Sequence, residues 1–339
     1  MSARLDGLAE RKDGNLVVFS GPSAFIGTGK TEYSRRILFD ISYAPEQDGE
    51  EPAAKDKDFT SHDIHLAIVE AFSTTTGLGK SLDNISVCER LFVNGRHIQA
   101  GGELLPDPLR PPVPSVTGDC LVSAAVNPSQ DFRSYVCVEI PGWQGQLVVT
   151  LFARAVYTGR SLFVEWTFRV LPPLREKFLL IDDLFEYPPY QQALNSLAAG
   201  LRATIPALLC SPGTALRPAL RPYAAKTRRN RLNYAIKHGY IFDYGAKRSI
   251  REDASSGKSR HFFLARDQSM YMLLAQQTLL QAVRGFLTDH GIDLENFDKQ
   301  AQVIFDHSIH IGDISDSSGI AVGVNSAANV NKDSEGKNA

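Results

Sequence analysis

The segment 134–171 decides the fold class of this chain. It holds three runs rich in β-branched and aromatic residues: SYVCVEI (134–140), QLVVTLFARAV (146–156) and SLFVEWTFRVL (161–171). Such composition favours β-strands, and residues 157–160 (YTGR) predict a hairpin turn between the last two runs. The sequence therefore predicts an antiparallel sheet in this region.

The residues before this segment predict further strands and one helix. Residues 16–20 and 37–43 are rich in β-formers, and the second run alternates with a period close to two. Ser61 is expected to cap a helix whose apolar residues share one face: Ile64, Ala67, Ile68 and Phe72. The charged stretch 44–58 predicts an exposed loop. We expect an α+β domain with a β-rich core over residues 1–173.

The second half of the chain changes character. Residues 187–242 lack Asp and Glu but contain eight basic residues: Arg202, Arg217, Arg221, Lys226, Arg228, Arg229, Arg231 and Lys237. An amphipathic helix is predicted where apolar residues recur every three or four positions: Leu194, Leu197, Leu201, Ile205 and Leu208. We call residues 174–260 the basic connector. A helical hairpin is expected at 261–308, and a Gly/Ser/Asn-rich, β-prone tail at 309–339.

Composition excludes several classes of protein. With 43% hydrophobic and 22% charged residues, the chain has the make-up of an average globular protein. Its net charge of −2 argues against a protein that coats nucleic acid. The cysteines form no CxxC pair, no signal peptide is visible, and no apolar run approaches the roughly 18 residues of a spanning helix. We therefore expect a cytoplasmic protein, with contact to a membrane surface at most.

Residues 24–31 (AFIGTGKT) match a relaxed phosphate-loop pattern. A nucleotide site would use Gly29, Lys30 and Thr31, with Asp182 from the later FLLIDD run. A phosphate loop, however, leads into a helix whose N-terminus holds the phosphate, whereas residues 37–43 predict a strand. We favour a structural turn and keep nucleotide binding as an alternative function.

Two histidine pairs, His62/His65 and His307/His310, have a spacing that places both rings on one helix face. A metal site needs a third ligand, and neither pair has a Cys or Glu at a diagnostic spacing. The chain also lacks a GxSxG elbow and any local Cys/His signature of a nucleophile. We therefore expect no metal, no cofactor and no catalytic residue, and interpret the protein as non-enzymatic.

The basic connector predicts contact with an anionic membrane surface, because cations attract acidic lipids and an apolar helix face inserts among them. The residues expected to make this contact are Arg217, Arg221, Lys226, Arg228, Arg229, Arg231, Leu197, Leu201 and Ile205. Packing of the same helix on the protein core is the structural alternative. Contact with nucleic acid through residues 217–237 is an alternative function, which we favour less.

The C-terminal tail predicts self-association. Its two short β-runs, IHIGDI (309–314) and SSGIAVG (317–323), carry little charge, and such runs pair edge to edge between chains. The residues expected to pair are Ile309, Ile311, Ile314, Ile320 and Val322. A hairpin that completes a sheet, or a disordered tail, is the alternative.

Six segments resemble an uncharacterised family of actinobacterial proteins that are often membrane-associated: NLVVFSGPSAFIGTG (15–29), RLFVNGRHIQ (90–99), LLPDPLRPPV (104–113), FDYGAKRSIRE (242–252), HGIDLENF (290–297) and IHIGDISDSSGIAVG (309–323). The resemblance implies that Gly27 and Gly29 form a structural turn, and it brings no activity. We expect an interaction or regulatory protein that is peripheral to an anionic membrane or a membrane partner and forms homo-oligomers through its tail.

Overall fold

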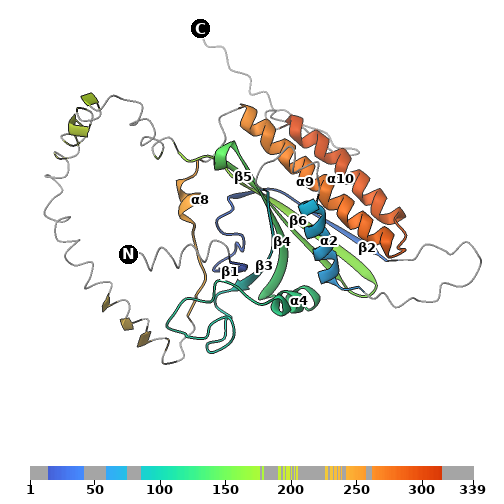
Figure 1. Cartoon of the computed structure of the whole chain (residues 1–339), viewed down its shortest axis with the longest axis horizontal. Helices are drawn as coiled ribbons and strands as arrows, with labels where there is room; N and C mark the ends of the chain where they lie inside the picture. The colour runs from blue at the N-terminus through green and yellow to red at the C-terminus, as the bar shows by residue number, and fades with distance from the viewer. Residues whose placement is uncertain are drawn as a thin grey trace, which may run out of the picture.

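The computed structural model describes residues 14–41, 59–74, 85–175, 242–256 and 262–314, together with scattered positions between 178 and 238. Its centre is a mixed sheet with the strand order β1-β3-β4-β5-β6-β2 (Figure 1). The strands are β1 (Leu16–Phe19), β2 (Lys30–Asp40), β3 (Ser86–Asn94), β4 (Phe132–Gly142), β5 (Leu147–Tyr157) and β6 (Ser161–Leu171). β1 and β3 are parallel, and the other neighbours are antiparallel. The chain is α+β, as its sequence predicts.

The three β-rich runs form the central strands β4, β5 and β6. The predicted hairpin turn joins β5 to β6, where the backbone N–H of Thr158 donates to the carbonyl of Ser161 at 3.0 Å. On β6 the residues alternate between buried and half-buried positions along the whole strand. This alternation gives the sheet two different faces, because successive side chains point to opposite sides.

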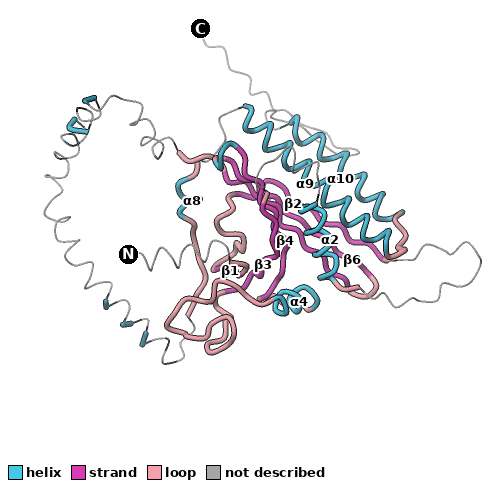
Figure 2. The backbone as a smooth tube through the Cα atoms, viewed as in Figure 1, coloured by secondary structure: helices cyan, strands magenta, loops and turns pink. Residues whose placement is uncertain are grey.

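Helices cover one face of the sheet (Figures 1 and 2). They are α2 (Ser61–Thr74), α4 (Gly118–Val126), α9 (Phe262–Asp289) and α10 (Glu295–Ile314). Leu279 of α9 and Phe297 of α10 share one hydrophobic cluster with Trp166 of β6. The helical hairpin that we predicted is therefore present, and it packs in the same core as the β-rich part of the chain.

The opposite face carries no helix within the described residues. Its aromatic centre is Phe25, whose ring stacks on Phe152 at 4.2 Å between centroids and meets Phe92 and Tyr135 edge-on. The short helix α8 (Ile250–Ala254) and the turn η1 (Trp143–Gly145) lie at one end of the sheet. None of the described helices is long and apolar enough to cross a bilayer.

The cap of α2 differs from the prediction. Thr60, not Ser61, caps this helix: the Thr60 N–H donates to the Asp63 carboxylate at 2.6 Å, and the Asp63 N–H donates back to the Thr60 hydroxyl oxygen at 3.4 Å. This is a capping box, in which two backbone donors of the first turn are satisfied reciprocally. Ser61 instead accepts a hydrogen bond from the N–H of Tyr157 at 2.9 Å.

The start of the predicted β-prone tail is helical. α10 continues to Ile314, so Ile309, Ile311 and Ile314 lie in a helix, and the prediction of a strand there is wrong. A helix gains one backbone hydrogen bond for each added residue, whereas a strand needs a partner strand, and residues 309–314 pair with none of the described strands. Ile320 and Val322, and the predicted loop from residue 44 to 58, lie outside the described residues.

Candidate functional site

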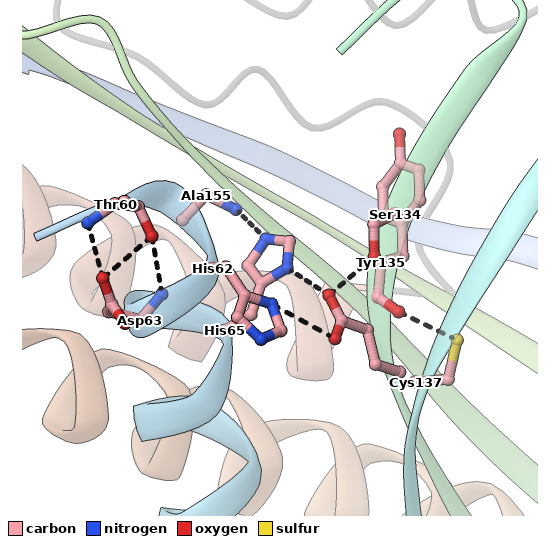
Figure 3. A network of polar contacts seen from close by, with 9 residues as sticks. Thr60, His62, Asp63, His65, Ser134, Tyr135, Cys137 and Ala155 are labelled. Carbon is pink, nitrogen blue, oxygen red and sulfur yellow. Dashed lines mark hydrogen bonds and ion pairs between the residues drawn. The ribbon is translucent and has the colours of Figure 1, made fainter. Parts of the chain in front are cut away.

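Three side chains of metal-ligand type meet beneath α2: His62 and His65 from the helix and Glu89 from β3 (Figure 3). Their ligand atoms all lie within 4.8 Å of one another. The Nδ1 atom of His65 lies 2.8 Å from Glu89 Oε1, and that of His62 lies 3.5 Å from Glu89 Oε2. The sequence showed the histidine pair but not its third partner, because β3 brings Glu89 in from a distant part of the chain.

The sheet explains why these residues meet. The β4–β5 ladder begins at the pair Val136↔Ala153, and beyond it the two strands separate. The next N–H groups of β5 are satisfied by α2: Ala155 donates to His65 Nε2 at 3.1 Å, and Tyr157 donates to Ser61. Ser61 and His65 are four residues apart on the helix, which is a rise of about 6 Å. Ala155 and Tyr157 are two residues apart on the strand, which is a rise of about 6.6 Å, so the two acceptors are spaced like the two N–H donors. Side chains of α2 thus replace β4 as partners of β5.

The hydrogen bonds determine the protonation state of the cluster. Because Ala155 donates to His65 Nε2, the proton of this ring is on Nδ1, from which it is donated to Glu89. The hydroxyl of Ser134 donates to the same carboxylate oxygen at 2.6 Å. Burial alone raises the pKa of Glu89, but the hydrogen bonds from His65 and Ser134, together with the electrostatic interaction with the two imidazole rings, outweigh burial and lower this pKa. Glu89 is therefore an ionised, well-satisfied carboxylate.

This arrangement does not fit a metal ion. Protonated at Nδ1, His65 has no lone pair there to offer, which leaves only His62 and Glu89 as facing ligands. Catalytic zinc sites use three protein ligands and structural ones use four. The cluster instead has a structural role, because it connects α2 to the sheet where β4 and β5 separate. We call His62, His65 and Glu89 the polar brace.

Two of the segments quoted above dock on each other at the edge of the sheet that β1 forms (Figure 2). Ala246 and Phe19 form a β-bridge, and the Asp243 carboxylate accepts hydrogen bonds from the Ser20 hydroxyl and from Arg96. Hydrogen bonds from Ser20, Gly245 and Arg96 lower the pKa of Asp243 against the opposing effect of its burial, which is the largest single influence. These contacts bring the segments 15–29 and 242–252 together as structural partners.

The segment that contains Gly27 and Gly29 forms a structural turn rather than a phosphate loop. Gly29 has a φ of +88°, and a Cβ placed on it would lie 1.9 Å from the Val170 carbonyl oxygen, so only glycine fits. Its N–H, which a phosphate would need, donates to the Glu252 carboxylate at 2.8 Å. Lys30 and Thr31 begin strand β2 rather than a helix. Asp182 lies outside the described residues. The three described residues, Gly29, Lys30 and Thr31, do not form a phosphate cradle.

Most described positions of the basic connector between residues 190 and 238 are exposed, while Gln191, Asn233 and Ile236 are half-buried. The side chains of Leu194 and Leu197 are 61% and 63% exposed, and Lys226 and Arg231 are exposed as well. The remaining predicted contact residues lie outside the described residues: Arg217, Arg221, Arg228, Arg229, Leu201 and Ile205. At its base the connector is tied to the end of α8 by a bridge between Leu174 and Ser255.

Comparison with known proteins places the chain in a family. A family model described as the AbeC-like domain matches residues 35–316. The chain belongs to the AbeC-like domain family. No curated protein and no solved structure matches it. The AbeC-like region runs from within β2 beyond the end of α10, so it includes both the polar brace and the basic connector.

Proposed function

We propose that this AbeC-like protein is a non-enzymatic interaction protein that associates with anionic membrane surfaces through its basic connector. The observation that carries the proposal is the exposure of Leu194 and Leu197, at 61% and 63%, within a segment that lacks acidic residues. A helix that packed on the core would bury these leucines. An exposed apolar face beside an excess of cations is the pattern of a helix that lies in a membrane interface.

Known magnitudes make this association strong enough to matter. Each Lys or Arg near an anionic bilayer contributes about 1 kcal/mol, so four such residues contribute about 4 kcal/mol. Each leucine that becomes fully buried in the bilayer adds about 1.5–3 kcal/mol. Two leucines and four cations together reach about 7–10 kcal/mol, which corresponds to a dissociation constant between about 10 μM and about 50 nM.

Vesicle flotation with charge variants tests the proposal. The first variant changes four connector residues to glutamine: Arg217, Arg221, Arg228 and Arg229. The control variant changes four exposed arginines of the folded body to glutamine: Arg36, Arg110, Arg133 and Arg160. Both variants lose the same charge, so a general effect of net charge would weaken binding to anionic vesicles equally.

The proposal predicts that the connector variant binds anionic vesicles about a thousandfold more weakly than the unmodified protein. The control variant should bind within a few-fold of the unmodified protein. Equal binding by all three proteins would refute the connector as the membrane contact.

A further inference from the structure

Four large apolar side chains are exposed in segments outside the predicted amphipathic helix that carries Leu194 and Leu197. Phe262 and Phe263, in the first turn of α9, are 66% and 71% exposed, Ile250 at the start of α8 is 91% exposed, and Trp143 in η1 is 42% exposed. Exposed aromatic residues that occur singly need no explanation, but a group of them on one surface marks a contact site.

Two hydrogen bonds join the segments that carry these residues into one surface. The indole Nε1 of Trp143 donates to Asp267 Oδ2 of α9 at 2.8 Å, one helical turn beyond Phe263. Arg251 of α8 donates to the carbonyl of Gln146, directly after η1, at 3.3 Å. Figure 1 accordingly shows α8, the start of β5 and the first turn of α9 at the same end of the sheet. We call Trp143, Ile250, Phe262 and Phe263 the aromatic end surface.

The backbone that presents Trp143 is strained. Trp143 and Gln144 both adopt left-handed conformations, with φ of +53° and +54°, and they are the only described residues other than glycine to do so. Turns of this kind between two strands ordinarily use Asn, Asp or Gly at such positions. Strained residues of this kind persist where the surrounding contacts fix them and are concentrated at functional sites, and here the turn holds a large indole ring that is 42% exposed.

The charges around this surface favour an anionic partner. Lys247 and Arg248 are exposed immediately before Ile250, and Arg266 is exposed with its guanidinium 5.2 Å from the centre of the Phe262 ring. Of the nearby acidic groups, Asp267 accepts the Trp143 hydrogen bond and Glu252 accepts one from Gly29, while Asp253 is exposed.

The position of the surface favours a lipid bilayer as that partner. Leu174, the first residue of the connector, bridges to Ser255 directly after α8, so this segment leaves the sheet at the same end. Tryptophan and phenylalanine suit the boundary between lipid headgroups and acyl chains, since their rings combine apolar area with, in tryptophan, a polar N–H.

We infer that the aromatic end surface is a second lipid-contact site, which inserts Trp143, Phe262 and Phe263 into the headgroup region of an anionic bilayer. This inference rests on the proposed membrane association and adds a part of the folded body to it. The connector supplies long-range attraction, and the aromatic end surface fixes the orientation of the sheet on the membrane.

Tryptophan fluorescence tests this inference directly. The chain has two tryptophans, and the other, Trp166, is 0% exposed in the core. Anionic vesicles with brominated acyl chains quench only those rings that enter the bilayer. The emission of the unmodified protein should fall with brominated vesicles but not with otherwise identical unbrominated ones. The variant Trp143→Phe, which keeps an aromatic ring there, should show no quenching although it still floats with the vesicles.

A pair of double variants provides a second measurement. Phe262→Ser with Phe263→Ser should weaken vesicle binding about tenfold or more. Leu38→Ser with Leu66→Ser, which removes exposed leucines on β2 and α2, should leave binding unchanged. Flotation without quenching would overturn the aromatic end surface and leave the connector intact. Absence of flotation would overturn both the connector and the aromatic end surface as lipid contacts. An equal loss of vesicle binding in the two double variants would refute the aromatic end surface.

Discussion

Replacing His65 with alanine removes the centre of the polar brace. The variant loses the acceptor for the Ala155 N–H and the donor to the Glu89 carboxylate, and both groups are in the interior. His65 itself is 0% exposed, so water does not readily replace its ring. We expect the strands β4 and β5 to lose their link to α2 at the point where they separate.

The magnitude follows from the two lost hydrogen bonds. A buried N–H left without a partner costs about 1–3 kcal/mol, and a hydrogen bond to a charged group contributes about 1.5–3 kcal/mol. The free energy of unfolding should therefore fall by about 2.5–6 kcal/mol for His65→Ala. Domains of this size are stable by about 5–15 kcal/mol in total, so the loss is large.

Urea unfolding followed by circular dichroism measures this loss. The matched control is His62→Ala on the same helix: its Nδ1 lies 3.5 Å from Glu89 and makes no hydrogen bond, and its side chain is 17% exposed. The control should cost less than about 1 kcal/mol. Equal losses in the two variants, or a loss below about 1 kcal/mol for His65→Ala, would refute the brace.

Three further predictions concern stability. The pKa of Glu89 is lower in the folded than in the unfolded protein, so the stability that Glu89 contributes is present above its ordinary value of 4.5 and is lost as the pH falls below it. In measurements from about pH 7 to about pH 3, the melting temperature should fall as the pH drops below 4.5, and the fall should be less steep for Glu89→Gln than for the unmodified protein. Gly29→Ala should lower stability by more than about 2 kcal/mol, because its Cβ meets a carbonyl oxygen. The control Gly101→Ala, with φ +79° and open space around it, should cost about 1 kcal/mol in the same urea titration. Thr60→Ala breaks the capping box and should cost about 1 kcal/mol in the same urea titration; an unchanged free energy of unfolding would contradict this role of Thr60.

The sequence predicted those parts of the fold that depend on neighbouring residues. The β5–β6 hairpin and the helices α2 and α9 are local, since their turn residues and periodicity lie within one short window. The strand β3 was missed, because its alternation is weak and both its partners, β1 and β4, are distant in the chain. Glu89 was missed as the partner of His65 for the same reason.

Surface features follow a similar division. The basic connector was recognised from composition alone, since the absence of Asp and Glu from residues 187–242 is visible without a structure. The aromatic end surface was not, because Trp143, Ile250 and Phe262 come from three separate segments. Only the sheet and α9 bring these segments to one end. The helical conformation of Ile309 to Ile314 was also missed, since isoleucine alternation favours a strand only where a partner strand is present.

Flotation of the unmodified full chain with neutral and with anionic vesicles, at low and at moderate salt, tests the central claim of membrane association most directly. We predict binding to anionic vesicles alone, and a fall in that binding as salt screens the connector's charges. Binding to neutral and anionic vesicles alike, or to neither at any salt concentration, would contradict the account.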